Sequence, residues 1–363
     1  MNDVLAIIVL PHNNQALRPL TNNRCQASIP FGSRYRMIDF ILSSMVHSSI
    51  TNVSILTSTH YRSLMDHLGD GRDWDLDRRQ DGLFVIPLAT KYEADQGDLA
   101  VLHQQLEYLK KSKQQHVLLS FSCLIVNIDF QPILNDHIHS DADITVLYKT
   151  KQLDDKTYMD IHIDEKQMTI SDENNSKHGL LDLYIIKKSL LIHLVENYAN
   201  QYSKFTDLLK NTALCGVVQG YQYDGYVTKV TTMKDYYDSS MDLLNNRSTR
   251  KMLHAPHEIY TKLKDEPPTV YGENTVVTNS LIANGCIIEG EVENSIVFRG
   301  VHVKKGAVVK NSIVMQRCEI NENVYIDGII LDKEVILDRN VSLTTTNNSP
   351  YVIEKNTHVK VDD

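Results

Sequence analysis

Aliphatic residues recur at every sixth position near the end of the chain. From residue 297 to residue 309 the sequence reads Val-Phe-Arg-Gly-Val-His-Val-Lys-Lys-Gly-Ala-Val-Val. Three rows keep this step: Val297, Val303 and Val309; Val270, Val276, Ile282 and Ile288; and Val324, Ile330 and Ile336. A six-residue period predicts a parallel β-helix, whose stacked coils bury the aliphatic rows. The alternative is an irregular β-sandwich, because alternating aliphatic residues also suit antiparallel strands.

The preceding part of the chain has a different pattern. Continuous aliphatic runs begin at residues 4, 53, 117 and 144, and helical spacing of apolar residues appears at 38–48 and 100–111. Strands that alternate with helices predict an α/β domain with a Rossmann-like, mostly parallel sheet. We expect this domain at 1–246, a connector containing Pro267 and Pro268 at 247–268, and the β-helix at 269–363.

Composition narrows the function classes. The 363 residues exceed a typical single domain, and the net charge of -9 disfavours nucleic acid as a partner. Five cysteines lack the spacing of a zinc site or of a disulfide framework, which fits a reducing cytoplasm. We expect no membrane segment, because the apolar runs are too short to span a bilayer.

The loop after the first strand is where such a sheet usually binds phosphate. Residues 10–18 read Leu-Pro-His-Asn-Asn-Gln-Ala-Leu-Arg and contain no glycine. Backbone amides approach a polyphosphate closely only where side chains are absent. We therefore expect no triphosphate cradle in this loop.

Residues 18–40 read Arg-Pro-Leu-Thr-Asn-Asn-Arg-Cys-Gln-Ala-Ser-Ile-Pro-Phe-Gly-Ser-Arg-Tyr-Arg-Met-Ile-Asp-Phe. This run resembles the N-terminal signature of the glucose-1-phosphate adenylyltransferases, the ADP-glucose pyrophosphorylase family. The resemblance covers essentially the whole chain. It implies a nucleotidyltransferase-type domain followed by a left-handed parallel β-helix, and a reaction in which ATP and glucose 1-phosphate give ADP-glucose and diphosphate.

The chain departs from the family at the positions that carry the chemistry. The family's loop glycines fall on Pro11, His12 and Asn14, its catalytic arginine on Ala16, its signature lysine on Gln26, and its two Mg²⁺-binding aspartates on Cys123 and Lys229. A thiol and an ammonium group are poor partners for a hard cation that prefers oxygen ligands. We therefore expect no catalytic residue, no metal site and no cofactor in this chain alone, with Mg²⁺ and ATP left to a catalytic partner. Asp98 and Asp129 are the carboxylates that an altered site could use.

Three arginines remain in the signature. Arg24 and Arg36 match family arginines that line an anion site for allosteric effectors, and Arg34 stands where the family usually has a lysine. Guanidinium groups this close in sequence could clamp a sugar phosphate or inorganic phosphate. The alternative is a set of structural ion pairs with carboxylates such as Asp39.

Two further features have simple interpretations. The charged run at 70–79 surrounds Trp74 and predicts local salt bridges, with a subunit or effector contact anchored on Trp74 as the alternative. His137 and His139 alternate as residues of a strand would, and we expect them at the surface.

The losses and the retained scaffold together resemble the GlgD-type subunit of the bacterial enzyme. The resemblance implies a regulatory, catalytically poor, cytoplasmic subunit in glycogen biosynthesis. It would modulate a catalytic homologue in a heterotetramer, form a homo-oligomer when alone, and respond to a small anionic effector. The alternatives are an active adenylyltransferase with an altered site and a free-standing sugar-phosphate sensor.

Overall fold

A computed structural model describes residues 3–10, 15–57, 60–88, 97–152, 155–164, 167–170, 176–245, 247–345 and 350–361. Contacts between residues divide the chain into two compact units. The first unit combines Met1–Asn13, Phe40–Lys229 and Pro256–Tyr260, and the second combines Asn14–Asp39, Val230–Ala255 and Thr261–Asp363.

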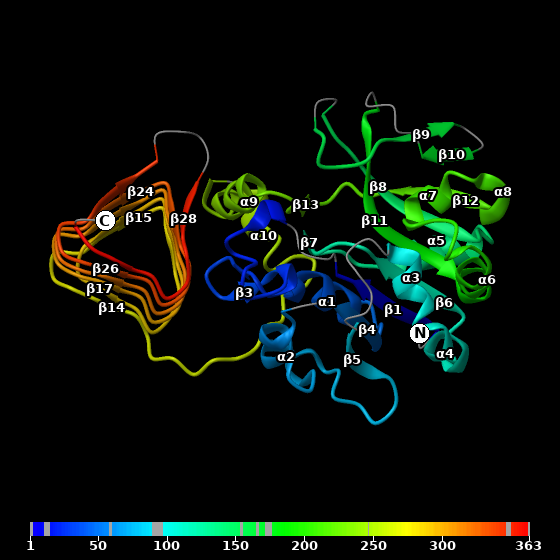
Figure 1. Ribbon diagram of the computed structural model, residues 1–363, viewed down its shortest axis with the longest axis horizontal. Coiled ribbons are helices and arrows are strands. Elements are labelled where there is room, and N and C mark those ends of the chain that lie inside the picture. Colours follow the sequence, from blue (N-terminus) through cyan, green and yellow to red (C-terminus); the bar gives the residue numbers. More distant parts are fainter. Residues whose placement is uncertain are drawn as a thin grey trace. The chain divides into compact units, whose positions relative to one another are not determined.

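The first unit is built on a seven-stranded sheet with the order β12-β8-β11-β6-β1-β4-β5 (Figure 1). Its strands are β1 (Val4–Val9), β4 (Asn52–Thr57), β5 (Gly82–Pro87), β6 (His116–Ser120), β8 (Ile144–Thr150), β11 (His178–Lys187) and β12 (Val218–Gln222). Strand β11 is antiparallel to both of its neighbours, and the other neighbouring pairs are parallel. The predicted mostly parallel sheet is confirmed.

Helices and short strands complete this unit. The helices are α1 (Met37–His47), α2 (Arg62–Leu68), α3 (Asp98–His103), α4 (Leu106–Lys111), α5 (Gln131–His139), α6 (Lys188–Tyr198), α7 (Phe205–Leu209) and α8 (Thr212–Cys215), with a 3₁₀ turn η3 (Arg72–Trp74). The short strands are β7 (Leu124–Val126), β9 (Ile161–Asp164), β10 (Gln167–Ile170) and β13 (Val227–Lys229). The helix predicted at 100–111 is two helices, because the chain leaves helical geometry at Gln105.

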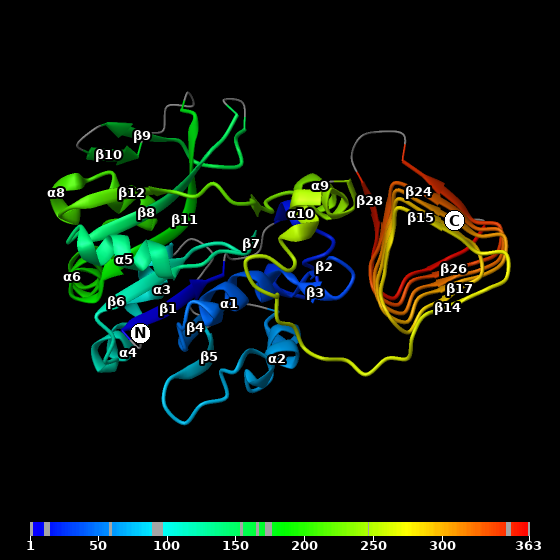
Figure 2. The same ribbon diagram turned by 180° about the vertical axis from the view of Figure 1, so that it is seen from behind.

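The second unit contains a three-sided coil of parallel strands, which Figure 2 shows from behind. One sheet has β14 (Val270–Tyr271), β17 (Ile287–Ile288), β20 (His302–Val303), β23 (Glu319–Ile320), β26 (Ile336–Leu337) and β29 (His358–Val359). The second has β15 (Val276–Thr278), β18 (Glu291–Glu293), β21 (Val308–Lys310), β24 (Tyr325–Asp327) and β27 (Ser342–Thr344). The third has β16 (Leu281–Ile282), β19 (Ile296–Val297), β22 (Ile313–Val314), β25 (Ile329–Leu331) and β28 (Tyr351–Ile353). Three parallel sheets exclude the β-sandwich and are consistent with the left-handed β-helix.

In the middle of the coil, a turn with one strand in each of the three sheets is shorter than three strict six-residue steps predict. Asn294 donates to Asn311 and Ser312 donates to Ser295, each across 17 residues, so equivalent positions recur after 17 residues here. Asn294 and Asn311 adopt left-handed φ values of 46° and 44°, which turn the chain tightly at one corner. Val297, Val303 and Val309 are buried as predicted. Val270 and Val276 are not: they are 60% and 51% exposed, because they belong to the first coil.

Two further segments pack with the coil inside the second unit. The first carries 3₁₀ turns η1 (Gln15–Leu17) and η2 (Gln26–Ser28) and the hairpin of β2 (Pro30–Phe31) and β3 (Tyr35–Arg36), and the second carries α9 (Met233–Asn245) and α10 (Arg247–Lys251). Tyr236 donates its hydroxyl to the Pro30 carbonyl at 2.7 Å, and Tyr237 donates to the Asn311 carbonyl at 2.5 Å. The packing therefore divides the chain differently from the boundaries predicted at residues 246 and 268.

In the part of the chain that the structure describes, no helix has the length and apolar character needed to cross a membrane.

Two isoleucines of one sheet test the core of the coil. Ile320 is fully buried, whereas Ile287 is 43% exposed on the outside of the same sheet. We expect Ile320→Ala to lower the free energy of unfolding by about 2–5 kcal/mol, because it leaves a cavity. Ile287→Ala is the matched control and should cost less than about 1 kcal/mol. Urea unfolding followed by circular dichroism measures both, and equal losses would contradict the assignment of inner and outer positions.

Candidate functional site

The two positions that the resemblance assigns to metal-binding aspartates lie close together in the first unit. Cys123 is fully buried just before β7. Strands β13 and β7 are antiparallel, and Lys229 is paired with Leu124. Lys229 is therefore a neighbour of Cys123 in space, although more than a hundred residues separate them in sequence.

The positive charge of Lys229 is balanced by a neighbouring carboxylate. Its ammonium group forms an ion pair with the carboxylate of Asp182, and the two side chains are only 21% and 16% exposed. The backbone N–H of Lys229 donates to the Tyr158 hydroxyl at 3.1 Å. A buried thiol and a paired ammonium do not provide the oxygen ligands that Mg²⁺ requires. The residues at these two positions therefore do not fit the metal of the family reaction.

Asp98 and Asp129, the two carboxylates that an altered site could use, lie in different surroundings. Asp98 starts α3 and accepts the backbone N–H of Phe205 at 3.4 Å, and its burial, together with the nearby Asp182, raises the pKa of its carboxyl group to about 6. Asp129 accepts the backbone N–H of Gln131 at 2.9 Å at the start of α5, which is a structural role. Asp98 therefore lies near the Asp182–Lys229 pair, and Asp129 does not take part in it.

The remaining catalytic positions contribute little to a site. Pro11, His12 and Asn14 lie outside the described residues. Ala16 is exposed on η1. The side-chain amide of Gln26 is buried and donates to the Val230 carbonyl at 2.6 Å, so Gln26 fastens the signature segment to the chain that precedes α9.

Arg24 belongs to a buried ion pair in the second unit. Its guanidinium contacts both carboxylate oxygens of Asp332 at 2.9 Å, and the two side chains are each 4% exposed. The sequence alternative of structural ion pairing applies to Arg24, but the partner is Asp332 and not Asp39. Asp39 instead accepts the backbone N–H of Arg36 at 2.9 Å.

Basic side chains gather around this pair, together with the carboxylates of Asp39, Glu266 and Glu334, the last of which pairs with Lys355 at 3.4 Å. Burial, and then the charges of Arg36 and Arg24, lower the pKa of Lys333 to about 7, with a smaller contribution from Lys355. Arg34 is exposed beside the Tyr35 ring, and burial together with the charge of Arg34 lowers the pKa of Arg299. We call Arg34, Arg36, Arg299, Lys333 and Lys355 the cation cluster. The structure thus brings two of the three predicted arginines next to basic residues of the coil.

Sequence reasoning missed Arg299, Lys333 and Lys355. These residues stand at equivalent positions of the coil, two residues after the paired positions 297, 331 and 353, and Gln316 holds the same position in the turn between Arg299 and Lys333. A search for basic residues repeated at one corner of the coil could have found them. Their proximity to the signature arginines was not readable, because it depends on how residues 14–39 pack.

The two remaining sequence predictions have different outcomes. Trp74 is fully buried against His67, while Arg72 pairs with Asp70 and Arg78 pairs with Asp75, so the charged run makes local salt bridges and Trp74 offers no surface anchor. The prediction of a strand is wrong for His137 and His139, which both lie in α5, and the prediction of a surface position is confirmed for His139 but wrong for His137. His137 is fully buried and contacts the Thr145 hydroxyl at 2.7 Å.

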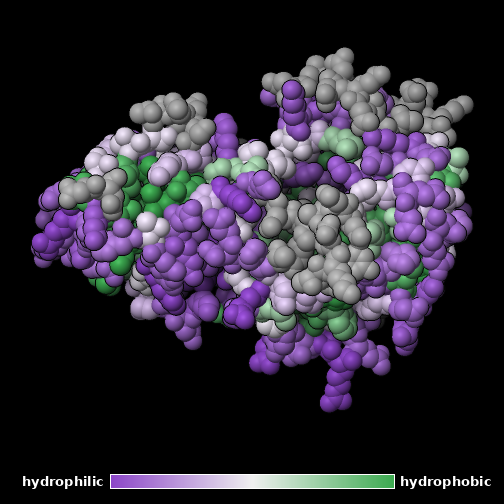
Figure 3. Space-filling view, viewed as in Figure 1, coloured by the Kyte–Doolittle hydropathy of each residue, from purple (hydrophilic) through white to green (hydrophobic). Residues whose placement is uncertain are grey.

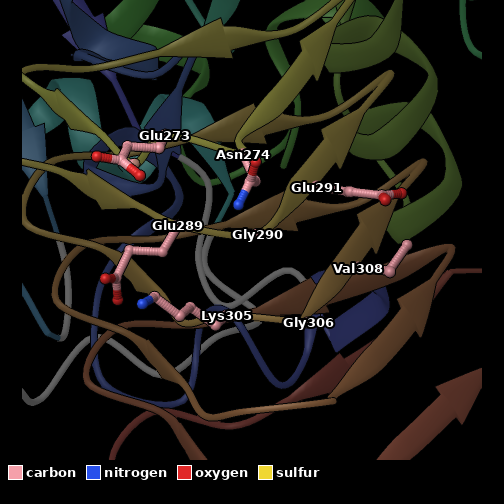
Figure 4. A pocket seen from close by; sticks show the side chains of 9 residues that line it. Glu273, Asn274, Glu289, Gly290, Glu291, Lys305, Gly306 and Val308 are labelled. Carbon is pink, nitrogen blue, oxygen red and sulfur yellow. The ribbon is translucent and has the colours of Figure 1, made fainter.

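An open groove of about 580 Å³ lies on the outside of the first coils (Figure 4). Glu273, Glu289 and Glu291 line it, and Lys305 is the cation among the labelled residues. Its charge is opposite to that of the cation cluster. Among the described residues no group of three or more His, Cys, Asp or Glu side chains is arranged to hold a metal ion, so the groove is not a metal site.

Comparison with known proteins decides the family. A nucleotidyl transferase family model matches residues 13–245, and a model of the GlmU-like C-terminal hexapeptide matches residues 268–349. The chain belongs to the ADP-glucose pyrophosphorylase family. It is 36% identical over 357 residues to the glycogen biosynthesis protein GlgD of Bacillus subtilis, covering 98% of this chain and 96% of that protein.

Two other members of the family are similar to this chain to different degrees. The GlgD protein of Geobacillus stearothermophilus is 38% identical over 312 residues, which cover 85% of this chain and 83% of that protein. A glucose-1-phosphate adenylyltransferase of Bacillus cereus is 28% identical over 363 residues, with 96% of each chain covered. The chain is thus more similar to these GlgD proteins than to this adenylyltransferase.

The contribution of the Arg24–Asp332 pair to the free energy of unfolding can be tested. Arg24→Ala leaves a buried carboxylate without its partner and should cost about 3–5 kcal/mol of unfolding free energy. Replacing both partners, as Arg24→Met with Asp332→Leu, should cost clearly less, because no charge remains buried. Arg72→Ala removes an exposed ion pair with Asp70 and is the control, expected to cost under about 1 kcal/mol. Denaturant unfolding would contradict the structural role of Arg24 if the Arg24 and Arg72 variants were equally stable.

Proposed function

We propose that this chain is a regulatory, catalytically poor subunit of a cytoplasmic ADP-glucose pyrophosphorylase in glycogen biosynthesis. The observation that carries the proposal is the pair of replacements at Cys123 and Lys229. Nucleotidyl transfer depends mostly on electrostatic stabilisation of the polyphosphate by metal ions and cations. A chain whose metal positions hold a buried thiol and a paired ammonium supplies little of that stabilisation.

A catalytic homologue supplies Mg²⁺, ATP and the transfer chemistry in this proposal. The two GlgD relatives carry glycogen biosynthesis in their names, and the similar Bacillus cereus protein is named for the adenylyltransferase activity. These names support a division of labour between two homologous chains. The proposal extends to a heterotetramer with the catalytic chain and to a homo-oligomer when this chain is alone.

The coil offers surface for such assembly. Large apolar side chains are exposed in its first two coils and near its end, and Figure 3 shows hydrophobic residues on the face of the coil that is turned to the viewer. The exposed residues are Val270, Tyr271, Val276, Ile287, Tyr351 and Val361. Terminal coils also have strand edges without a neighbour on one side, which favour pairing with another chain. This surface supports a homologous subunit as the partner.

The cation cluster supports the second part of the proposal, a small anionic effector. Arg36 lies near Lys333 and Arg34 lies near Arg299, and these charges add to burial in lowering the pKa values of Lys333 and Arg299. A sugar phosphate or inorganic phosphate would relieve this repulsion and accept several charge-assisted hydrogen bonds. Because Arg24 is paired with Asp332, we assign anion binding to the cation cluster and keep Arg24 as its support.

A mixing experiment tests the regulatory role. The purified chain alone should form ADP-glucose far below the roughly 10 s⁻¹ of an ordinary enzyme. Mixed with its catalytic homologue, it should form a stable complex and change the KM or the effector response of that enzyme. Turnover of about 1 s⁻¹ or more by the chain alone would support the altered-site enzyme instead. Absence of any complex, with effector binding retained, would support the free-standing sensor.

The charge state of Lys333 predicts how effector binding depends on pH. With a pKa of about 7, Lys333 gains its charge as the pH falls from 8 to 6, so an anion should bind up to about tenfold more tightly at pH 6. Sulfate is the suitable probe, because its own charge is constant over this range. Calorimetry at constant ionic strength measures the affinity.

Two variants complete that measurement. Lys333→Gln should remove most of the pH dependence. Lys310→Gln is the control, because Lys310 is paired with Glu293 on another part of the coil and should leave the affinity unchanged. Sulfate affinity that is the same at pH 6 and pH 8 in the wild type would contradict the role of Lys333.

A further inference from the structure

The Lys229–Asp182 ion pair lies at the carboxyl end of a central parallel strand. Asp182 lies beside Phe121, just beyond the pair that Leu183 forms with Ser120 at the end of β6. Its carbonyl accepts the Phe121 N–H at 3.1 Å. Lys229 approaches from β13, next to Cys123. In parallel sheets the crevice outside the carboxyl ends of the strands is where ligands usually bind. The pair therefore occupies the position of a ligand contact and not that of an ordinary surface salt bridge.

The backbone at Asp182 is adjusted to deliver its side chain. Strand β11 carries a register shift between Leu180 and Tyr184, and Asp182 inside this bulge has a left-handed φ of 55°. Only a few per cent of non-glycine residues adopt such φ values. Bulges re-aim side chains at functional sites, and here the re-aimed carboxylate meets the Lys229 ammonium.

Negative charge is crowded at this point. The charge of Asp182 adds to burial in raising the pKa of Asp98. Burial and the charges of both carboxylates also raise the pKa of the Tyr184 hydroxyl. The Tyr184 hydroxyl donates to Asp182 at 3.5 Å. Carboxylates held away from water need a cation or shared protons. Lys229 is the cation that the structure shows in contact with Asp182.

We propose that the ammonium of Lys229 is a built-in replacement for the divalent cation, neutralising Asp182 beside Asp98 and keeping metal ions out of the crevice. The replacement is only partial in its chemistry. An ammonium group donates three hydrogen bonds, but it cannot offer open coordination positions to phosphate oxygens. The crevice keeps its charge balance and its fold while it loses the transfer reaction. This inference concerns metal binding by the chain alone and does not require the proposed partner.

Manganese binding tests the replacement directly. We expect one Mn²⁺ to bind per chain in Lys229→Gln, where Asp182 is left without its cation and Asp98 lies near it, and none at this site in the wild type. Electron paramagnetic resonance counts bound Mn²⁺, and 1 mM Mn²⁺ should raise the melting temperature of the variant by about 2–4 °C. Lys229→Ala, which frees more space, repeats the test should the Gln side chain itself block the ion.

Two further variants locate the effect. Lys187→Gln is the matched control: Lys187 also contacts two carboxylates, Asp141 at 2.8 Å and Asp143 at 3.0 Å, but Asp141 is 91% exposed, and we expect no Mn²⁺ response. Adding Asp182→Gly to Lys229→Gln should abolish the new site. The proposal is overturned if wild type binds Mn²⁺ in a way that Asp182→Gly removes, if neither Lys229 variant gains Mn²⁺, or if the double variant still binds it.

Discussion

The carboxylate of Asp332 holds the guanidinium of Arg24 away from water, and the second unit depends on this ion pair. It ties the signature segment of residues 14–39 to the coil, where Tyr236 and Tyr237 add contacts from α9. An unpartnered charge at either end would cost several kcal/mol, so the pair constrains the packing of both segments. It also fixes β3, and with it Arg34 and Arg36, beside the basic corner of the coil.

The two units differ in how their basic side chains are paired. In the first unit the Lys229 ammonium is paired with the carboxylate of Asp182. In the second unit burial and the charges of Arg36 and Arg24 lower the pKa of Lys333, and we propose a small anion as the ligand of the cation cluster. In our proposal the chain keeps the family fold and a means of responding to an anion, while the positions for metal-assisted transfer hold a thiol and a paired ammonium. This combination is what a regulatory member of an enzyme family would need.

Much of this architecture was readable from the sequence, because it rests on local periodicity. The aliphatic runs identified β1, β4, β6 and β8, and the six-residue step identified the coil. The resemblance located Cys123 and Lys229, and the structure placed them next to each other. What could not be read depends on distant packing: Asp332 as the partner of Arg24, Asp182 as the partner of Lys229, and Lys333 beside Arg36. His137 was misplaced because two histidines at alternate positions resemble a strand, whereas apolar Ile133 and Leu134 bury one face of a helix.

We infer that this chain retains the family fold without metal-dependent nucleotide chemistry. Calorimetric titration of the wild-type chain with ATP, with and without 5 mM Mg²⁺, measures this most directly. We predict that Mg²⁺ leaves the affinity for ATP unchanged or lowers it, because Lys229 and Cys123 offer the ion no ligands. Tightening of ATP binding by about tenfold or more on addition of Mg²⁺ would contradict the account.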